Sequence, residues 1–196
     1  MSINKLAAAI VAVALTLTAC SADTNSDPGT AAGAFNDADV LFAQQMIPHH
    51  HQALLMASMA QRNADTEEVR QLAGRIEAAQ QPEIDQMLSW LNDWRGQLPN
   101  PKGHMMVGDG KGEQHNMTGM MGSRQLRKLD RATGPNFDRL WLSMMIEHHQ
   151  GAVEMAQQEQ SDGIYPDAVA LAKHIETSQA AEIALMKELL AAQGTK

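Results

Sequence analysis

An internal repeat constrains the fold of this chain more than any other feature of its sequence. At an offset of 99 residues, Met46-Ile47-Pro48-His49-His50 aligns with Met145-Ile146-Glu147-His148-His149. The register continues without a gap as far as Leu91 and Leu190. A repeated unit that cannot bury its apolar face alone must pack against its copy. The sequence therefore predicts two equivalent halves that share one core.

Each repeat predicts a hairpin of two helices. Apolar positions at steps of three and four residues indicate a first helix over 37–62, and the acidic start Asp65-Thr66-Glu67-Glu68, which has the spacing of a capping box, indicates a second helix ending near residue 94. The second repeat predicts helices over 135–160 and 166–192. Pro48 and Pro82 fall inside helices of the first repeat, so we expect kinks there but no breaks. Two such hairpins predict an all-α protein, a four-helix bundle with pseudo-two-fold symmetry.

The composition excludes several classes of protein. The formal charge is −8, and this acidic balance argues against a nucleic-acid partner, because binding phosphates needs clustered Lys and Arg. The single cysteine excludes a disulfide framework and a zinc site made of cysteines alone. The low aromatic content of 4% and the 14 methionines favour helices over strands.

The N-terminus predicts export and lipid anchoring. Lys5 precedes an apolar run from Leu6 to Ala19, which is too short to span a bilayer but suits a signal peptide over residues 1–19. Leu17-Thr18-Ala19-Cys20 resembles the bacterial lipobox, in which the cysteine is lipidated, so Cys20 is the expected lipidation site. We therefore expect the protein on the extracytoplasmic face of the cell membrane.

The rest of the chain divides at changes in composition. Residues 20–36 are small and polar and predict a flexible tether. The domain over 37–192 comprises repeat one (37–95), a linker rich in Met, His and Gly (96–134), and repeat two (135–192). The linker predicts a short basic helix over 123–131.

In the first helix of each repeat, the first histidine of the pair shares one face with two methionines, and the second histidine flanks that face. Imidazole and thioether together favour copper, and thioether selects Cu(I). The candidate metal ligands on the helices are His49, His50, His148, His149, Met46, Met56, Met145 and Met155. The hairpin register brings the following candidates for supporting these ligands close to them: Glu77, Gln80, Glu83, Glu176, Gln179 and Glu182.

The same side chains also fit purely structural roles. Each methionine could simply fill the core, and the histidines could belong to a buried polar network that fixes the helix register. His51 and His174 have no histidine at the equivalent position of the other repeat, so we expect them to be solvated or structural.

The linker carries a second group of candidate ligands, which core packing does not explain. A flexible Gly-rich segment with soft ligands is suited to capturing Cu(I). These residues are His104, Met105, Met106, His115, Met117, Met120 and Met121.

The repeated motif resembles a known bacterial family. The stretches MIPHHHQALLMA and MIEHHQGAVEMA, followed by IEAAQQPEI and IETSQAAEI, resemble the domain of unknown function 305 family over about residues 37–192. The resemblance implies a ferritin-like four-helix bundle that is exported, with some members linked to copper binding and copper resistance. His51 and the long Met-rich insertion depart from the family pattern.

Three hypotheses follow from the sequence. The first is a lipid-anchored copper-binding protein that sequesters or delivers copper, and that is a binding protein more than an enzyme. The second is a ferritin-like redox protein with a di-metal centre, although no helix carries the usual Glu-x-x-His pair. The third is an accessory or scaffold lipoprotein with an envelope protein as its partner. The oligomeric state stays open.

Overall fold

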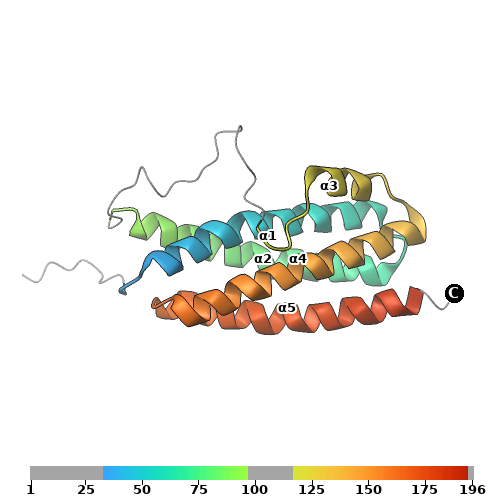
Figure 1. Cartoon of the computed structure of the whole chain (residues 1–196). Coiled ribbons are helices and arrows are strands. Elements are labelled where there is room, and N and C mark those ends of the chain that lie inside the picture. The colour runs from blue at the N-terminus through green and yellow to red at the C-terminus, as the bar shows by residue number, and fades with distance from the viewer. Residues whose placement is uncertain (1–32, 97–116, 194–196) are drawn as a thin grey trace, which may run out of the picture. The chain divides into compact units, whose positions relative to one another are not determined.

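The computed structural model describes residues 33–96 and 117–193, and this part of the chain is all-α (Figure 1). It contains five helices and no strand, so the predicted all-α class is confirmed. The helices are α1 Asp37–Asn63, α2 Glu67–Trp94, α3 Ser123–Asp130, α4 Gly134–Asp162 and α5 Pro166–Gln193.

The helix ends lie within two residues of the predicted positions. α1 and α2 continue through Pro48 and Pro82, so neither proline breaks its helix. The predicted signal peptide, the lipidation site Cys20 and linker residues 97–116 lie outside the described residues. Among the described helices, none is both long enough and apolar enough to cross a membrane.

Buried aspartates at the start of α1 and α4 cap the opposite hairpin. Asp39 in α1 accepts hydrogen bonds from the backbone amides of Ile164 (3.1 Å) and Tyr165 (2.9 Å), just before α5. Its repeat equivalent, Asp138 in α4, accepts from the backbone amides of Asp65 and Thr66, both at 2.9 Å, just before α2. Each aspartate thus satisfies amides that the start of a helix leaves without partners, and ties the two hairpins together.

The capping box predicted at residues 65–68 is wrong. The Thr66 side chain makes no cap within its own helix. Its hydroxyl instead donates to Asp138 at 2.6 Å, and the Asp138 carboxylate takes over the capping role. The sequence pattern considered only neighbouring residues as acceptors for the start of α2, whereas the acceptor in the structure is a carboxylate 72 residues further along the chain.

The apolar core consists of two separate clusters. α1 packs against α2 and α4, and α4 packs against α5. One cluster includes Met56, Ile76, Met145 and Met186, and the other includes Met46, Met87, Ala152 and Ile175. The two clusters are therefore separated along the chain by about two turns on α1 and α4 and by about three turns on α2 and α5.

Polar residues fill the interval between the clusters. On α1 and α4 these are the histidine pairs at 49–50 and 148–149, and on α2 and α5 they are Gln80, Glu83, Gln179 and Glu182. All four histidines are at most 1% exposed. We call these eight side chains the polar layer; it is where the chemistry of the molecule is concentrated.

The reciprocal caps predict a large effect at Asp138. Replacing this residue (Asp138→Ala) removes three hydrogen bonds to a buried carboxylate, so we expect the free energy of unfolding to fall by about 2–4 kcal/mol. Chemical denaturation measures the loss. Asp130→Ala is the control, because Asp130 is 56% exposed and its pair with Arg62 spans 3.7 Å, so its removal should change little. Equal losses in the two variants would contradict the capping role.

Candidate metal centre

His49 and His148 meet at the centre of the polar layer. Their ring centroids lie 3.7 Å apart with the planes tilted by 34°. Neither nitrogen of either ring makes a hydrogen bond of standard geometry among the described residues, although all four nitrogens are buried and the backbones of Thr118 and His49 lie beside the rings of His49 and His148, respectively. Buried polar atoms normally have partners, and leaving one without costs roughly 1–3 kcal/mol. Packing alone therefore does not account for this arrangement.

Both central imidazoles are neutral. Burial, followed by repulsion from His50 and His149, lowers the pKa of His49 to about 3, and the backbone of Thr118 opposes the shift. Burial also holds the pKa of His148 well below its usual value, with further repulsion from the other three imidazoles. A neutral imidazole carries a free lone pair, which is the form that binds metals.

The outer histidine of each pair is held by a carboxylate from the neighbouring helix. His50 Nε2 donates to Glu83 Oε2 at 2.7 Å, and His149 Nε2 donates to Glu182 Oε2 at the same distance. Because a carboxylate accepts, the proton of each ring sits on Nε2, and a neutral ring then has its lone pair on Nδ1. Both Nδ1 atoms are buried and have no partner among the described residues. Carboxylates orient metal-binding histidines in this way.

The other predicted supporting residues behave differently. Gln80 and Gln179 are each 3% exposed, and their side-chain oxygens have no partner in the described part of the chain. Glu77 is exposed, and Glu176 accepts from Gln157 and Gln160 instead of contacting an imidazole.

The last residues of the linker form a strap, Met117–Gly122, across the two histidine-bearing helices. Met121 exchanges two hydrogen bonds with the Gln52 side chain of α1: its amide donates at 2.6 Å, and its carbonyl accepts at 2.9 Å. On α4, a Cβ on Gly119 would lie 2.7 Å from the carbonyl oxygen of Glu147, and a Cβ on Gly151 would collide with the backbone of Thr118. Two glycines thus allow the strap to lie directly on α4.

Four of the nine predicted methionine ligands are buried. Met46 and Met145 are 0% exposed and lie one helical turn before His49 and His148. Met56 is equally buried, and Met121 is 3% exposed. The remaining candidates in the described ranges, Met117, Met120 and Met155, are half-buried. The linker candidates His104, Met105, Met106 and His115 lie outside the described residues.

Oxygen and nitrogen donors alone do not complete a site here. Within residues 33–96 and 117–193, no three His, Cys, Asp or Glu side chains come together in an arrangement that could hold a metal ion. The arrangement can supply neutral imidazoles, and a full ligand set would also need thioether sulfur. Such a mixed set suits a soft ion.

Three features of the centre were not predicted from the sequence. Gln52 and Gly151 occupy equivalent positions of the two repeats, and both hold the strap. The sequence offered one indication of this contact: Gly151 lies inside a predicted helix, and such a glycine often marks a close approach of another backbone. His174, expected to be solvated or structural, is 68% exposed, yet its Nε2 lies 3.9 Å from Glu83 Oε1 at the edge of the polar layer.

Comparison with known proteins gives one family. The sequence model of a domain of unknown function, DUF305, matches residues 39–190. A comparison with curated proteins gives no match.

Several solved structures resemble the chain. A DUF305 protein of Streptomyces coelicolor, described as a candidate secreted protein, is 34% identical with a TM-score of 0.69, over 80% of this chain and 92% of that one. A DUF305 fragment from Deinococcus radiodurans is 30% identical with a TM-score of 0.69, over 82% and 99%. CopM in its Cu(I)-bound form is 32% identical with a TM-score of 0.63, over 79% and 96%, and its Cu(II)-bound, Ag-bound and apo forms are also similar.

The close approach of the strap predicts an unusual response to a small substitution. Gly151→Ala should displace Thr118 and lower the free energy of unfolding by about 1–3 kcal/mol, because an added methyl group has no space there. Hydrogen exchange should speed up at the strap amides. Gly74→Ala is the matched control, because its Cβ would meet only a side-chain atom at 3.5 Å, and alanine favours the helix. A gain in stability from both variants would show that the strap is not seated on α4.

Proposed function

Because the chain belongs to the DUF305 family, whose sequence model matches residues 39–190, we propose that it binds copper in its polar layer. One observation carries the proposal: six imidazole nitrogens of the four layer histidines are buried without hydrogen-bond partners in the described part of the chain. A bound ion would offset the free-energy cost of burying these lone pairs. The similar protein CopM has structures in Cu(I)-bound and Cu(II)-bound forms, which supports the choice of metal.

The proposed ligands divide into two groups. Nδ1 of His50 and of His149 are the imidazole ligands whose orientation is fixed, since Glu83 and Glu182 hold the opposite nitrogen. His49 and His148 supply further neutral nitrogens, and Met46, Met56, Met145 and Met155 supply thioether sulfur nearby.

Cu(I) is the favoured oxidation state. Thioethers bind Cu(I) selectively and need no deprotonation, so they stay available as the pH falls. The described carboxylates and imidazoles do not form a three-donor group by themselves, which makes sulfur a necessary part of the site. The same finding leaves the di-metal redox alternative without support, because such a centre relies on clustered carboxylates.

The linker is proposed to collect the metal. His104, Met105, Met106 and His115 would capture Cu(I) first, and Met117, Met120 and Met121 continue this group into the strap. Met121 is hydrogen-bonded to Gln52, two residues after His50 on α1, so the methionines of the strap would receive the metal next to the polar layer.

Location and architecture complete the proposal. The four long helices form a ferritin-like four-helix bundle made of two repeated hairpins over 37–192. Residues 1–19 direct export, Cys20 carries the lipid, and residues 20–36 tether the domain to the extracytoplasmic face of the cell membrane. There the protein sequesters copper or delivers it to an envelope partner.

Competition with a chromogenic Cu(I) chelator under anaerobic conditions tests copper binding. The full chain should withdraw Cu(I) from the chelator, and His50→Ala/His149→Ala should abolish binding at the layer. Glu83→Gln/Glu182→Gln should weaken it about 10–100-fold, because the imidazoles lose the carboxylates that orient them.

The controls separate the polar layer from the linker. His51→Ala removes an exposed imidazole next to the layer and should leave the affinity unchanged. Replacing the linker ligands His104, Met105 and Met106 should remove a separate class of sites and spare the layer. If the full chain fails to compete, or if His50→Ala/His149→Ala binds as tightly as the unaltered chain, the copper proposal is wrong.

A further inference from the structure

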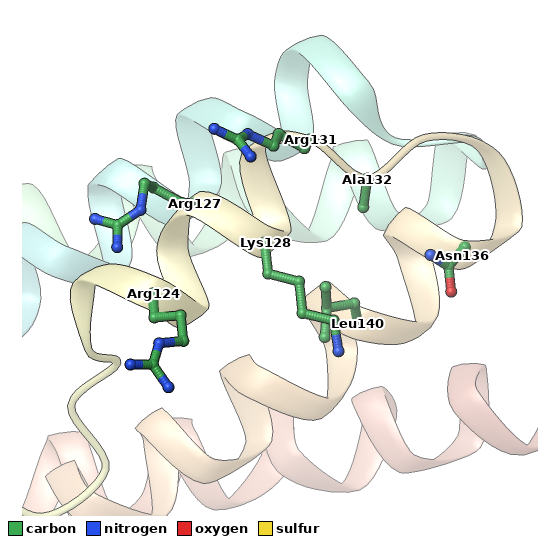
Figure 2. Close-up of a pocket in the computed structure, with 7 residues that line it drawn as sticks. All are labelled: Arg124, Arg127, Lys128, Arg131, Ala132, Asn136 and Leu140. Atoms are coloured by element: carbon green, nitrogen blue, oxygen red, sulfur yellow. The ribbon is translucent and has the colours of Figure 1, made fainter.

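A concentrated positive surface lies on α3 of this otherwise acidic protein. The chain has a formal charge of −8, yet five of its 15 Lys and Arg residues fall within residues 124–139. They are Arg124, Arg127, Lys128, Arg131 and Arg139. The first four line an open cleft of about 480 Å³ between α3 and the start of α4, together with Asn136 and Leu140 (Figure 2). We call these four cations the α3 cluster.

The α3 cluster has no acidic partner in the described part of the chain. All four side chains are exposed. Asp130, the acidic residue within α3, pairs with Arg62 of α1 instead. Like charges held close together without counter-charges destabilise the folded protein, so an external anion would be bound favourably.

The helix itself is built to display these charges. Leu129 is fully buried in an apolar cluster and Leu126 packs against the same cluster, which turns the opposite face of α3 outward. The Asn63 side chain of α1 donates to the Asp130 carbonyl at 3.2 Å and fixes the C-terminal end of α3. Gly122, directly before α3, follows the tethered Met121, so both ends are anchored. The backbone that carries the cluster is therefore held in place at both ends.

The geometry favours an extended array of negative charges over one small anion. Figure 2 shows Arg127 and Arg131 extending away from α3, while Lys128 reaches toward Leu140 across the cleft. Four cations that diverge in this way cannot enclose one phosphate, but they can each approach a different headgroup of an anionic bilayer. Leu140 adds an apolar contact beside the cations.

We propose that the α3 cluster docks the domain on an anionic phospholipid surface. The choice of a membrane rests in part on the proposed lipid anchor, because a tethered domain meets that surface continually. A basic patch attracts anionic headgroups and would add a second contact beside the lipid anchor. Since α3 directly follows the strap, this contact would turn the strap side of the polar layer toward the bilayer.

Vesicle co-sedimentation tests the proposal with the chain over residues 20–196 carrying Cys20→Ser, so that neither an acyl chain nor the apolar run Leu6–Ala19 contributes. Binding is compared between vesicles of phosphatidylcholine alone and vesicles that also contain phosphatidylglycerol. The added anionic lipid should strengthen binding, and higher salt should weaken it. R124Q/R127Q/K128Q/R131Q should reduce the phosphatidylglycerol-dependent part of binding by more than about tenfold, since each cation contributes about fivefold near an anionic surface.

A matched variant removes the same charge elsewhere. R75Q/R95Q/K173Q/K187Q neutralises four exposed cations outside the α3 cluster and should retain most of the binding. Circular dichroism checks that both variants fold, and Cu(I) competition should be the same for both. The lipid anchor is tested separately, by the mass of this protein purified from the cell envelope. A protein without lipid would contradict the anchor but would not change the vesicle result.

Three outcomes would overturn the proposal. The first is equal loss of binding in the two variants. The second is binding that does not depend on phosphatidylglycerol. The third is tight binding of inorganic phosphate, measured by calorimetry, that depends on the α3 cluster while vesicle binding does not; this would assign the cleft to a free anion.

Discussion

The burial of neutral imidazoles between two apolar clusters is the interaction on which the rest of this structure depends. Folding buries four histidine side chains that do not regain a full set of hydrogen bonds. The apolar clusters on either side must compensate for that free-energy cost. The tilted rings of His49 and His148 can approach to 3.7 Å between centroids because burial keeps both rings uncharged. The polar layer thus lowers the stability of the core, and a local departure from full hydrogen bonding commonly marks a functional site.

The position of the layer follows from how the two repeats are joined. Asp39 and Asp138 each cap a helix of the other hairpin, and the Trp141 indole donates to the Met56 carbonyl at 2.9 Å, so α4 cannot slide along α1. This fixed register brings the histidine pair of one repeat level with that of the other. The strap then holds the end of the Met-rich linker against both helices. The binding chemistry is therefore a consequence of duplication together with a fixed register.

The sequence alone predicted the parts of the fold that depend on periodic patterns. The repeat and the three- and four-residue spacing of apolar residues predicted the helix ends to within two residues. The histidine pairs of both repeats are buried. The DUF305 resemblance, which rested on the same motif, is confirmed.

Long-range contacts could not be predicted in the same way. The hairpin register predicted Glu77 and Glu176 as neighbours of the imidazoles along with Glu83 and Glu182, whereas the contacts are made by Glu83 and Glu182. Packing angles decide between successive turns of a helix, and the sequence does not give them. The strap could not be foreseen, because it depends on a backbone approach at Gly151. Glu159 is a further example: its equivalent in the first repeat is Ala60, yet it is 2% exposed, and burial together with Asp39 raises its pKa to about 8.

The most direct measurement is the ¹⁵N nuclear magnetic resonance spectrum of the histidine imidazoles, recorded without metal and with a stoichiometric amount of Cu(I). Without metal, we expect neutral rings at His49 and His148 and the Nε2–H tautomer at His50 and His149. On addition of Cu(I), the Nδ1 resonances of His50 and His149 should shift strongly while their Nε2 protons remain. Charged rings in the metal-free protein, or Nδ1 resonances that stay in place while the protein binds Cu(I), would contradict the proposed metal centre.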